Sequence, residues 1–342
     1  MKTITLLGID LAKDVFELRG VNALGEVVLK RSLKRSQLSA FTAQLVPCRI
    51  AMEACGGSHY WSRLFRSQGH QPLMIAAQHV KPFKKSRQKN DTKDAEAIVD
   101  AASRPNMKYV GEKNLFQQDV QSLLRVRQQL VALKLQISNQ MRGLLMEYGV
   151  ILPKGFAHLK KQIPGILEDG QNDLTPIIRD LISSQYTSFK RTNDELKLLE
   201  VKIAHFLKPN EDYQRLLGVP GVGPLGASSF IASVGDPSSF KNGRHLAAWA
   251  GLVPTQMSSG GKEKLGGITK TGDKHLRATL IHGARALITA TIRRQKKDPY
   301  SQWILKLYKE KGWNRTSVAV ANKNVRVMWH LLKNKEEYKH AI

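Results

Sequence analysis

Cysteine, acidic side chains and long apolar runs are all scarce in this chain of 342 residues. Its two cysteines, Cys48 and Cys55, are too few for a disulfide framework and lack the second pair of a zinc site, so we expect a reducing cytoplasm and two core thiols. No apolar run approaches the roughly 20 residues that span a bilayer, so no membrane partner is expected. Residues 1–7 lack a cleavage-like site and indicate a strand, not a secretory signal.

Because acidic residues are scarce, the chain carries a large positive net charge. The chain has 28 Asp and Glu against 54 Lys and Arg, a formal net charge of +26. Basic residues along most of the length favour a nucleic-acid partner over a small acidic substrate, although a basic structural protein such as a ribosomal one shares this composition. A hydrophobic content of 42% argues against wholesale disorder, and the length suits two domains with a connector.

Short β-prone runs alternate with helical stretches over residues 1–113. We expect three successive antiparallel strands, then a helix, a strand, a second helix and a further strand, at 4–9, 15–21, 27–32, 36–45, 49–53, 58–68 and 72–76. This order predicts an α/β domain with a mixed sheet of RNase H-like type and helices on its faces.

A long helix without proline is expected from 114 to about 149, roughly 50 Å at 1.5 Å per residue. Its apolar side chains recur every seven residues, at Phe116, Leu123, Leu130, Ile137 and Leu144. The stretch 187–207 repeats this spacing, which predicts a coiled-coil hairpin across a loop at 153–176. We assign 114–210 to this connector and expect it to serve dimerisation; two helices packed inside a bundle explain the pattern equally well.

The last region, 211–342, is expected to be mainly helical. Residues 218–223, Gly-Val-Pro-Gly-Val-Gly, have the form of a helix-hairpin-helix turn, in which Gly221 and Gly223 let backbone N–H groups approach a phosphate. A glycine-rich turn between packed helices is the alternative. Further helices are expected near 245–251, 274–294, 299–311 and 317–333, with a loop at 258–272.

Four carboxylates form the main candidate site. Asp10 and Glu53 each end an apolar run, and Asp91 and Asp94 stand three apart, which places them on one helical face. A carboxylate at the end of an apolar strand is costly to bury unless it is paired or metal-bound, and two metal ions need several carboxylates. We therefore expect Mg²⁺ or Mn²⁺ here, although Asp91 and Asp94 also suit a helix cap.

A basic stretch precedes the Asp91–Asp94 pair. It carries Lys84, Lys85, Arg87 and Lys89, which we expect to hold a phosphate backbone against the metals. The alternative is that this charge run is only a solvated face.

A second candidate site is the serine- and glycine-rich loop that begins at Ser258. It fails the test for a P-loop, because no Gly-Lys-Ser/Thr follows at the required spacing. A serine with Lys262, Lys270 and Arg277 nearby suits attack on a phosphodiester, since cations lower the cost of an alkoxide. A merely serine-rich loop is the alternative.

Five motifs occur in order along the chain. They are Gly8-Ile9-Asp10-Leu11-Ala12-Lys13, Met52-Glu53-Ala54-Cys55-Gly56, Asn90-Asp91-Thr92-Lys93-Asp94-Ala95, the 218–223 hairpin, and a block from Ser259-Gly260 through Gly267-Ile268-Thr269-Lys270-Thr271-Gly272-Asp273 to Leu276-Arg277. Together they cover nearly the whole chain and resemble the insertion-sequence transposases with an N-terminal RuvC-like domain, the group that includes the pilin-gene inverting recombinases.

The resemblance implies a RuvC-like domain whose Asp-Glu-Asp-Asp metal site is formed by the four acids, and a nucleophilic serine at Ser259, with Ser258 as the runner-up. It also implies strand exchange guided by a structured non-coding RNA that pairs with donor and target DNA. In such recombinases the half-sites meet across subunits, which implies a homo-oligomer, a dimer or a tetramer. The expected location is a prokaryotic cytoplasm, in association with the nucleoid.

The sequence therefore predicts a metal-dependent transposase or site-specific DNA recombinase with a serine nucleophile. A hydrolytic RuvC-like Holliday-junction resolvase, which would use only the acids and metal-activated water, is the first alternative. A non-enzymatic nucleic-acid-binding protein is the second, since the basic charge alone would suffice for it.

Overall fold

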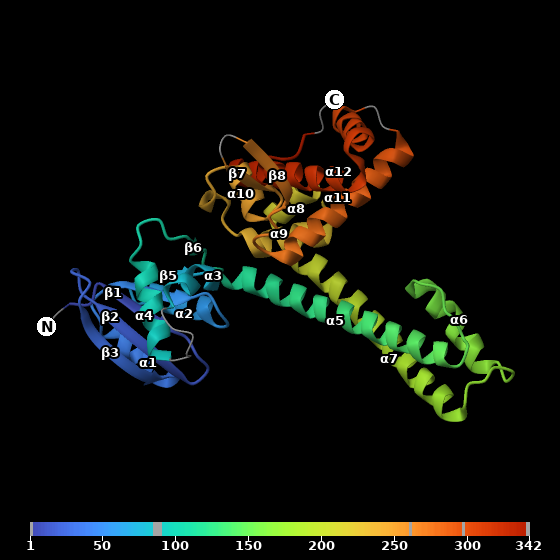
Figure 1. Ribbon diagram of the computed structural model, residues 1–342, viewed down its shortest axis with the longest axis horizontal. Helices are drawn as coiled ribbons and strands as arrows, with labels where there is room; N and C mark the ends of the chain where they lie inside the picture. Colours follow the sequence, from blue (N-terminus) through green and yellow to red (C-terminus); the bar gives the residue numbers. More distant parts are fainter. Residues whose placement is uncertain (1–2, 85–90, 260–261, 296–297, 340–342) are drawn as a thin grey trace. The chain divides into compact units, whose positions relative to one another are not determined.

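The computed structural model describes residues 3–84, 91–259, 262–295 and 298–339. The chain divides into two compact units, Met1–Asn114 and Leu115–Ile342, whose elements are labelled in Figure 1. The further division of the second unit into a connector at 114–210 and a region at 211–342 stays a prediction. Among the described residues, no helix combines the length and the apolar character that a membrane crossing requires.

A six-stranded mixed sheet forms the centre of the first unit, with the order β3-β2-β1-β4-β5-β6. The first three strands are antiparallel to one another, β4 runs parallel to β1 and to β5, and a short β6 closes the edge antiparallel to β5. The strands are β1 Leu6–Asp10, β2 Val15–Val21, β3 Val27–Lys34, β4 Arg49–Glu53, β5 Gln71–Ile75 and β6 Tyr109–Val110. The predicted mixed sheet is thus confirmed, and β6 is an addition to it.

Helices cover both faces of this sheet. Alternate residues of the inner strands point to opposite faces, so that Leu7 and Ile9 join one core and Leu6 joins the other. The helices α1 and α2 cover the first core, and α4 covers the second. The helices are α1 Arg35–Ala43, α2 Ser58–Ser67, α3 Ala77–Val80, the 3₁₀ turn η1 Lys81–Phe83 and α4 Asp91–Ala102.

Two long helices, α5 Leu115–Glu147 and α7 Pro176–Leu207, pack along each other at the start of the second unit (Figure 1). The expected loop at 153–176 is wrong in part, because it contains the helix α6 Phe156–Glu168, with Pro164 inside it. The expected start of the second helix at 187 is also wrong. Pro176 occupies the first turn of α7, where proline is well tolerated, and Thr175 caps the helix.

The seam between α5 and α7 is only partly apolar. Of the five heptad positions predicted on α5, Ile137 is buried and the other four are half-buried. Polar pairs join the middle of the two helices instead: an Arg127 nitrogen lies 2.7 Å from an oxygen of Glu200, and Lys134 Nζ lies 2.9 Å from Asn193 Oδ1. The coiled-coil description remains a prediction.

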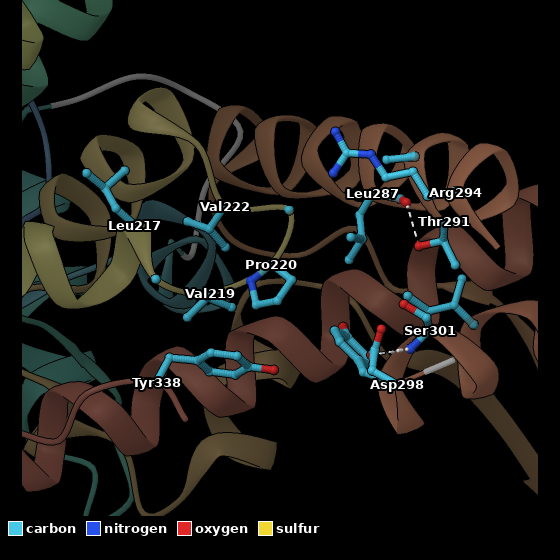
Figure 2. A pocket seen from close by; sticks show the side chains of 15 residues that line it. Leu217, Val219, Pro220, Val222, Leu287, Thr291, Arg294, Asp298, Ser301 and Tyr338 are labelled. Carbon is cyan, nitrogen blue, oxygen red and sulfur yellow. Dashed lines mark hydrogen bonds between the residues drawn. The ribbon is translucent and has the colours of Figure 1, made fainter. Parts of the chain in front are cut away.

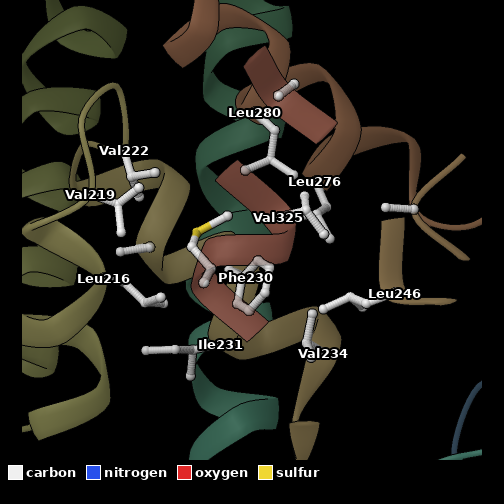
Figure 3. Packing of buried hydrophobic residues seen from close by; sticks show 14 of the residues in the cluster. Leu216, Val219, Val222, Phe230, Ile231, Val234, Leu246, Leu276, Leu280 and Val325 are labelled. Atoms are coloured by element: carbon white, nitrogen blue, oxygen red, sulfur yellow. The ribbon is translucent and has the colours of Figure 1, made fainter. Parts of the chain in front are cut away.

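The remaining helices of the second unit share one apolar core, part of which Figure 3 shows. Phe230 of α9 is fully buried there, near Leu276 and Leu280 of α11 and Val325 of α12. The helices are α8 Glu211–Leu217, α9 Pro224–Val234, the 3₁₀ turn η2 Pro237–Ser239, α10 Gly243–Trp249, α11 Lys274–Arg294 and α12 Pro299–Asn334. The two terminal helices predicted from sequence form α12, interrupted at Gly312, where φ is 73°.

The loop expected at 258–272 is wrong at 258–259 and at 262–268. A two-stranded antiparallel hairpin, β7 Pro254–Ser259 and β8 Lys262–Ile268, occupies this region. Backbone pairing supplies the hydrogen bonds of such a hairpin whatever its side chains, so glycine and serine do not prevent it.

Candidate active site

Strand pairing brings the first two predicted metal ligands together. In the parallel pair of β1 and β4, Ile9 lies opposite Met52, and Asp10 and Glu53 are the next residues of the two strands. Carboxyl ends of neighbouring parallel strands meet at one edge of a sheet, so both carboxylates stand at this edge. Each side chain is half-buried.

Gly8 lets α4 approach this edge closely. A Cβ atom built on Gly8 would lie 2.5 Å from Cγ2 of Val99 and 2.9 Å from the carbonyl oxygen of Ala95, so the helix touches the bare backbone of β1. An ion pair of 3.0 Å between Arg19 of β2 and Glu96 also holds α4 on the sheet. Sequence analysis missed the role of Gly8, although a lone glycine inside a strand often marks such close approach.

The third acid, Asp94, is joined to Glu53 through a lysine. Lys84 Nζ lies 3.1 Å from Asp94 Oδ1 and 3.7 Å from Glu53 Oε2. Burial by itself lowers the pKa of this ammonium, but its hydrogen bond with Asp94 and the charges of Asp94, Glu53 and Asp10 raise the pKa overall. One cation therefore interacts with three of the four predicted ligands.

Cys55 lies close enough to Glu53 and Asp10 to be affected by their negative charges. Although the residue is exposed overall, partial desolvation of its thiol raises the pKa, and the negative charges of Glu53 and Asp10 raise it further. The expectation of two core thiols is wrong for this residue, which is exposed, whereas Cys48 is buried.

The donor set fits a hard divalent cation, because carboxylate oxygens are preferred ligands of Mg²⁺ and Mn²⁺ and a protein cation already lies between two of them. Among the side chains that are described, no three ligating groups converge closely enough to hold an ion by themselves. Asp91 begins α4, but its side chain lies outside the described residues. Lys85, Arg87 and Lys89 also fall outside them, so their contact with phosphate stays a prediction.

The predicted nucleophile lies at the end of a strand. Ser259 is the last residue of β7 and pairs with Lys262 of β8, while Ser258 pairs with Glu263. The side chains of these four residues lie outside the described part, so the roles of Ser259 and Lys262 stay predictions.

Two predicted phosphate-binding cations follow the hairpin. Lys270 is exposed and adopts a positive φ of 56°. Arg277 is only 8% exposed, and its NH1 group donates hydrogen bonds to the carbonyl oxygens of Ala250 and Thr271 at 3.2 and 2.5 Å. In this arrangement Arg277 supports the segment that leads from the hairpin into α11, and its contact with phosphate remains a prediction.

The glycine turn at 218–223 links α8 to α9, and its residues 218–222 line a cavity of about 320 Å³ (Figure 2). Gly221 has a φ of +80°, and a Cβ there would lie 3.0 Å from the Gly283 carbonyl oxygen, so the turn packs against α11. A Cβ on Gly223 would meet open space. Whether these glycines bind phosphate, as a helix-hairpin-helix would, stays a prediction.

Asn324 fixes this turn from α12, a role that sequence analysis missed. Its side chain is 3% exposed. Nδ2 donates to the carbonyl oxygen of Pro220, and Oδ1 accepts from the hydroxyl of Tyr300, both at 2.8 Å. A buried amide on an otherwise apolar helix face is the signal that could have found it, since buried polar groups are hydrogen-bonded.

Comparison with known proteins settles the family. A DEDD transposase profile of the IS110 type matches residues 7–150, and the Transposase IS116/IS110/IS902 family profile matches residues 213–300. The chain is 43% identical over 339 residues to the transposase for insertion sequence element IS1111A of Coxiella burnetii. The aligned region covers 99% of this chain and 92% of that protein. The chain belongs to the IS116/IS110/IS902 family of transposases.

Other transposases agree with this one along almost their whole length. A probable family 20 transposase of Pseudomonas aeruginosa is 42% identical, with 98% of this chain and 99% of that protein aligned. The transposase for insertion sequence element IS1328 of Yersinia enterocolitica is 35% identical, over 96% of this chain and 97% of that protein. The protein is therefore an insertion-sequence transposase, an enzyme that cleaves and rejoins DNA.

Proposed function

We propose that this transposase cleaves DNA with a divalent metal ion held by Asp10, Glu53, Asp91 and Asp94 and with a serine nucleophile, Ser259. The observation that supports the metal site is the position of the Lys84 ammonium, which interacts with three of these acids. Carboxylates that attract a protein cation to the end of two parallel strands have the charge and the oxygen donors that Mg²⁺ or Mn²⁺ requires.

The metal, when bound, supplies positive charge that stabilises the developing charge on the scissile phosphate. The acids of β1, β4 and α4 hold that charge in place. In the proposed reaction the hydroxyl oxygen of Ser259 forms a bond to phosphorus, the bond from phosphorus to the DNA oxygen breaks, and the serine proton leaves to the solvent or to the departing oxygen. The resulting phosphoserine ester conserves the linkage energy for rejoining to another strand.

The proposal extends to partners. A net charge of +26 supports the binding of nucleic acid, and the family resemblance adds a structured non-coding guide RNA that pairs with donor and target DNA. Apolar side chains exposed along the α5–α7 pair, such as Leu135 and Leu198, support a homo-oligomer, dimer or tetramer, through these helices.

A suicide DNA substrate tests the reaction. The unmutated protein is mixed with labelled DNA whose departing strand diffuses away, with Mn²⁺ or with a chelator, and covalent protein–DNA adducts are resolved on a denaturing gel. An adduct that needs the metal supports the proposal. Nicked DNA without any adduct would favour the hydrolytic resolvase, and no cleavage under any metal would contradict both.

A further inference from the structure

A second cavity of the C-terminal unit lies between the β7–β8 hairpin and α12. Its volume is about 1280 Å³, and Pro254 and residues 265–268 face the α12 segment from Trp303 to His330 across it. We call it the hairpin groove. It shares no lining residue with the cavity beside the 218–223 turn, and it exceeds the roughly 300–1,000 Å³ of common small-molecule pockets.

The two walls of the groove are tied together. Nδ2 of Asn322, on α12, donates a hydrogen bond of 3.1 Å to the carbonyl oxygen of Leu252, just before β7. Both residues line the groove. The groove is therefore formed by the fold of this unit before any ligand arrives.

The α12 wall is cationic. Its charged or titratable lining residues are Arg315, Lys323, Arg326 and His330. No carboxylate lines the groove among the side chains that the structure describes. Glu336 Oε2 lies 3.5 Å from His330 Nε2, but the described lining itself carries charge of one sign. Such a lining attracts a polyanion.

Lys323 combines this charge with an aromatic surface. Its Nζ atom lies 4.3 Å from the ring centre of Trp303 and 4.5 Å from that of Tyr300. Burial and then the positive charge of Arg326 lower its pKa, and no described carboxylate acts on it in the opposite direction. An anionic group in the groove would stabilise this ammonium.

Apolar side chains also line both walls of the groove. Trp303 and Val327 of α12 and Leu265 and Ile268 of β8 line it next to the cations. Exposed bases stack on or pack against such surfaces, whereas the bases of a duplex are already stacked inside it. An acidic peptide would satisfy the charge but would leave this apolar lining unused.

We propose that the hairpin groove binds a single-stranded polynucleotide, with phosphates at Lys323 and Arg326 and a base against Trp303. The inference rests on the proposed function in one respect, that strand exchange presents an opened strand. DNA and RNA strands share the chemistry that the groove recognises, and the experiment separates them.

The test measures binding of fluorescein-labelled oligothymidylate and oligouridylate to the full chain by fluorescence anisotropy. Lys323→Gln with Arg326→Gln is expected to weaken single-strand binding about tenfold and to make the slope of log K against log salt shallower by about 0.7 per lost contact. The matched control is Lys306→Gln with Lys309→Gln, which removes the same charge from exposed positions of α12 outside the groove. If the Lys323→Gln, Arg326→Gln protein loses more affinity for oligothymidylate, the groove binds DNA. If it loses more affinity for oligouridylate, the groove binds RNA.

A second measurement does not depend on charge. An oligonucleotide that carries iodouracil is irradiated with the Ser259→Ala protein, and the cross-linked peptides are mapped by mass spectrometry. We expect cross-links at the peptide that contains Trp303. Because this variant lacks the proposed nucleophile, such cross-links would support the groove even if no adduct ever formed in the unmutated protein.

Three outcomes would overturn the groove as a single-strand site. One is an equal loss of affinity in the two double variants. Another is a set of cross-links confined to peptides that do not line the groove. A loss of duplex binding as large as the loss of single-strand binding would also contradict it.

Discussion

Lys84 lies with its ammonium 3.1 Å from Oδ1 of Asp94, inside the group of acids predicted to hold metal. The same ammonium lies 3.7 Å from Glu53, and both carboxylates are about one quarter exposed, at 25% and 29%. Like charges this close repel one another when no cation is present. Lys84 therefore balances the acids, and a divalent ion bound by them would have to compete with it.

We predict that Lys84→Met binds Mn²⁺ more tightly than the unmutated protein. Methionine keeps an unbranched chain of similar length but removes the competing charge, so affinity should rise by about tenfold, or 1.4 kcal/mol. Isothermal titration calorimetry measures it without reference to activity. The control is Lys81→Met, an exposed lysine of η1.

Thermal unfolding gives a second readout for Lys84→Met. Without metal the variant should melt earlier than the control, since the acids lose their counter-ion, and Mn²⁺ should raise its melting temperature more. Unchanged Mn²⁺ affinity together with unchanged melting would show that Lys84 does not occupy the cation position.

The acids are expected to be needed for chemistry but not for binding. Asp10→Ala, Glu53→Ala and Asp91→Ala should each abolish strand exchange while DNA and RNA affinity stays within about twofold, because the basic surface supplies affinity. Asp14→Ala, at an exposed acid beside β2, should leave both unchanged. Recombination at the unmutated rate in any of the three would remove that residue from the site.

Ser259→Ala should bind substrate and form no covalent adduct, whereas Ser258→Ala should be much milder. The reason is that only a serine hydroxyl can form the phosphoserine ester that retains the linkage for rejoining. Adducts trapped on suicide DNA are digested, and the modified peptide is mapped by mass spectrometry. An adduct that persists in Ser259→Ala would transfer the assignment to Ser258 or to another residue.

Gly8→Ala should loosen α4 on the sheet. The new methyl group would lie 2.5 Å from Val99 and 2.9 Å from a backbone oxygen, and such overpacking costs about 1–3 kcal/mol. Hydrogen exchange should speed up in β1 and α4, and Mn²⁺ affinity should fall because Asp94 moves with the helix. Gly56→Ala, whose Cβ meets nothing within 4 Å, is the matched control; identical exchange in the two variants would refute the close approach.

Nucleic-acid affinity should fall steeply with salt. Neutralising many phosphates releases counter-ions, so six to ten contacts would cost about 10³–10⁵ in affinity between 50 and 200 mM salt. Filter binding or anisotropy over this range measures the slope. A flat dependence would show that phosphate contacts do not dominate.

The strands of the first unit were predictable because their apolar runs are short and bounded. The run that ends at Glu53 shows why: burial on both faces leaves a continuous apolar segment, and the charge marks its end. The mixed sheet and the neighbouring positions of Asp10 and Glu53 follow from this pattern. The Asp91–Asp94 spacing likewise placed the start of a helix correctly.

The sequence does not predict the contacts of Lys84 with Glu53 and Asp94, the helix α6 or the start of α7, because they depend on long-range contacts or have weak local signals. The sequence predicts a phosphate contact for Lys84, which stays a prediction, and nothing local shows that its ammonium reaches Glu53 and Asp94. Pro164 obscures the helix α6 in the sequence, and Pro176 obscures the first third of α7, since proline usually breaks a helix. Packing of the α6 face against α5 and α7 outweighs that cost.

The α5–α7 pair joins two apolar cores that have no residue in common. One contains Val120 and Leu207 and belongs to the C-terminal helices, and the other contains Met141 and Phe189 at the far end. No residue of α5 between Leu124 and Ile137 is buried. The far end thus has an apolar core of its own, and whole turns could be added to or removed from the middle of the pair without changing the residues of either core. The length of the α5–α7 pair can therefore change without repacking either core of the enzyme.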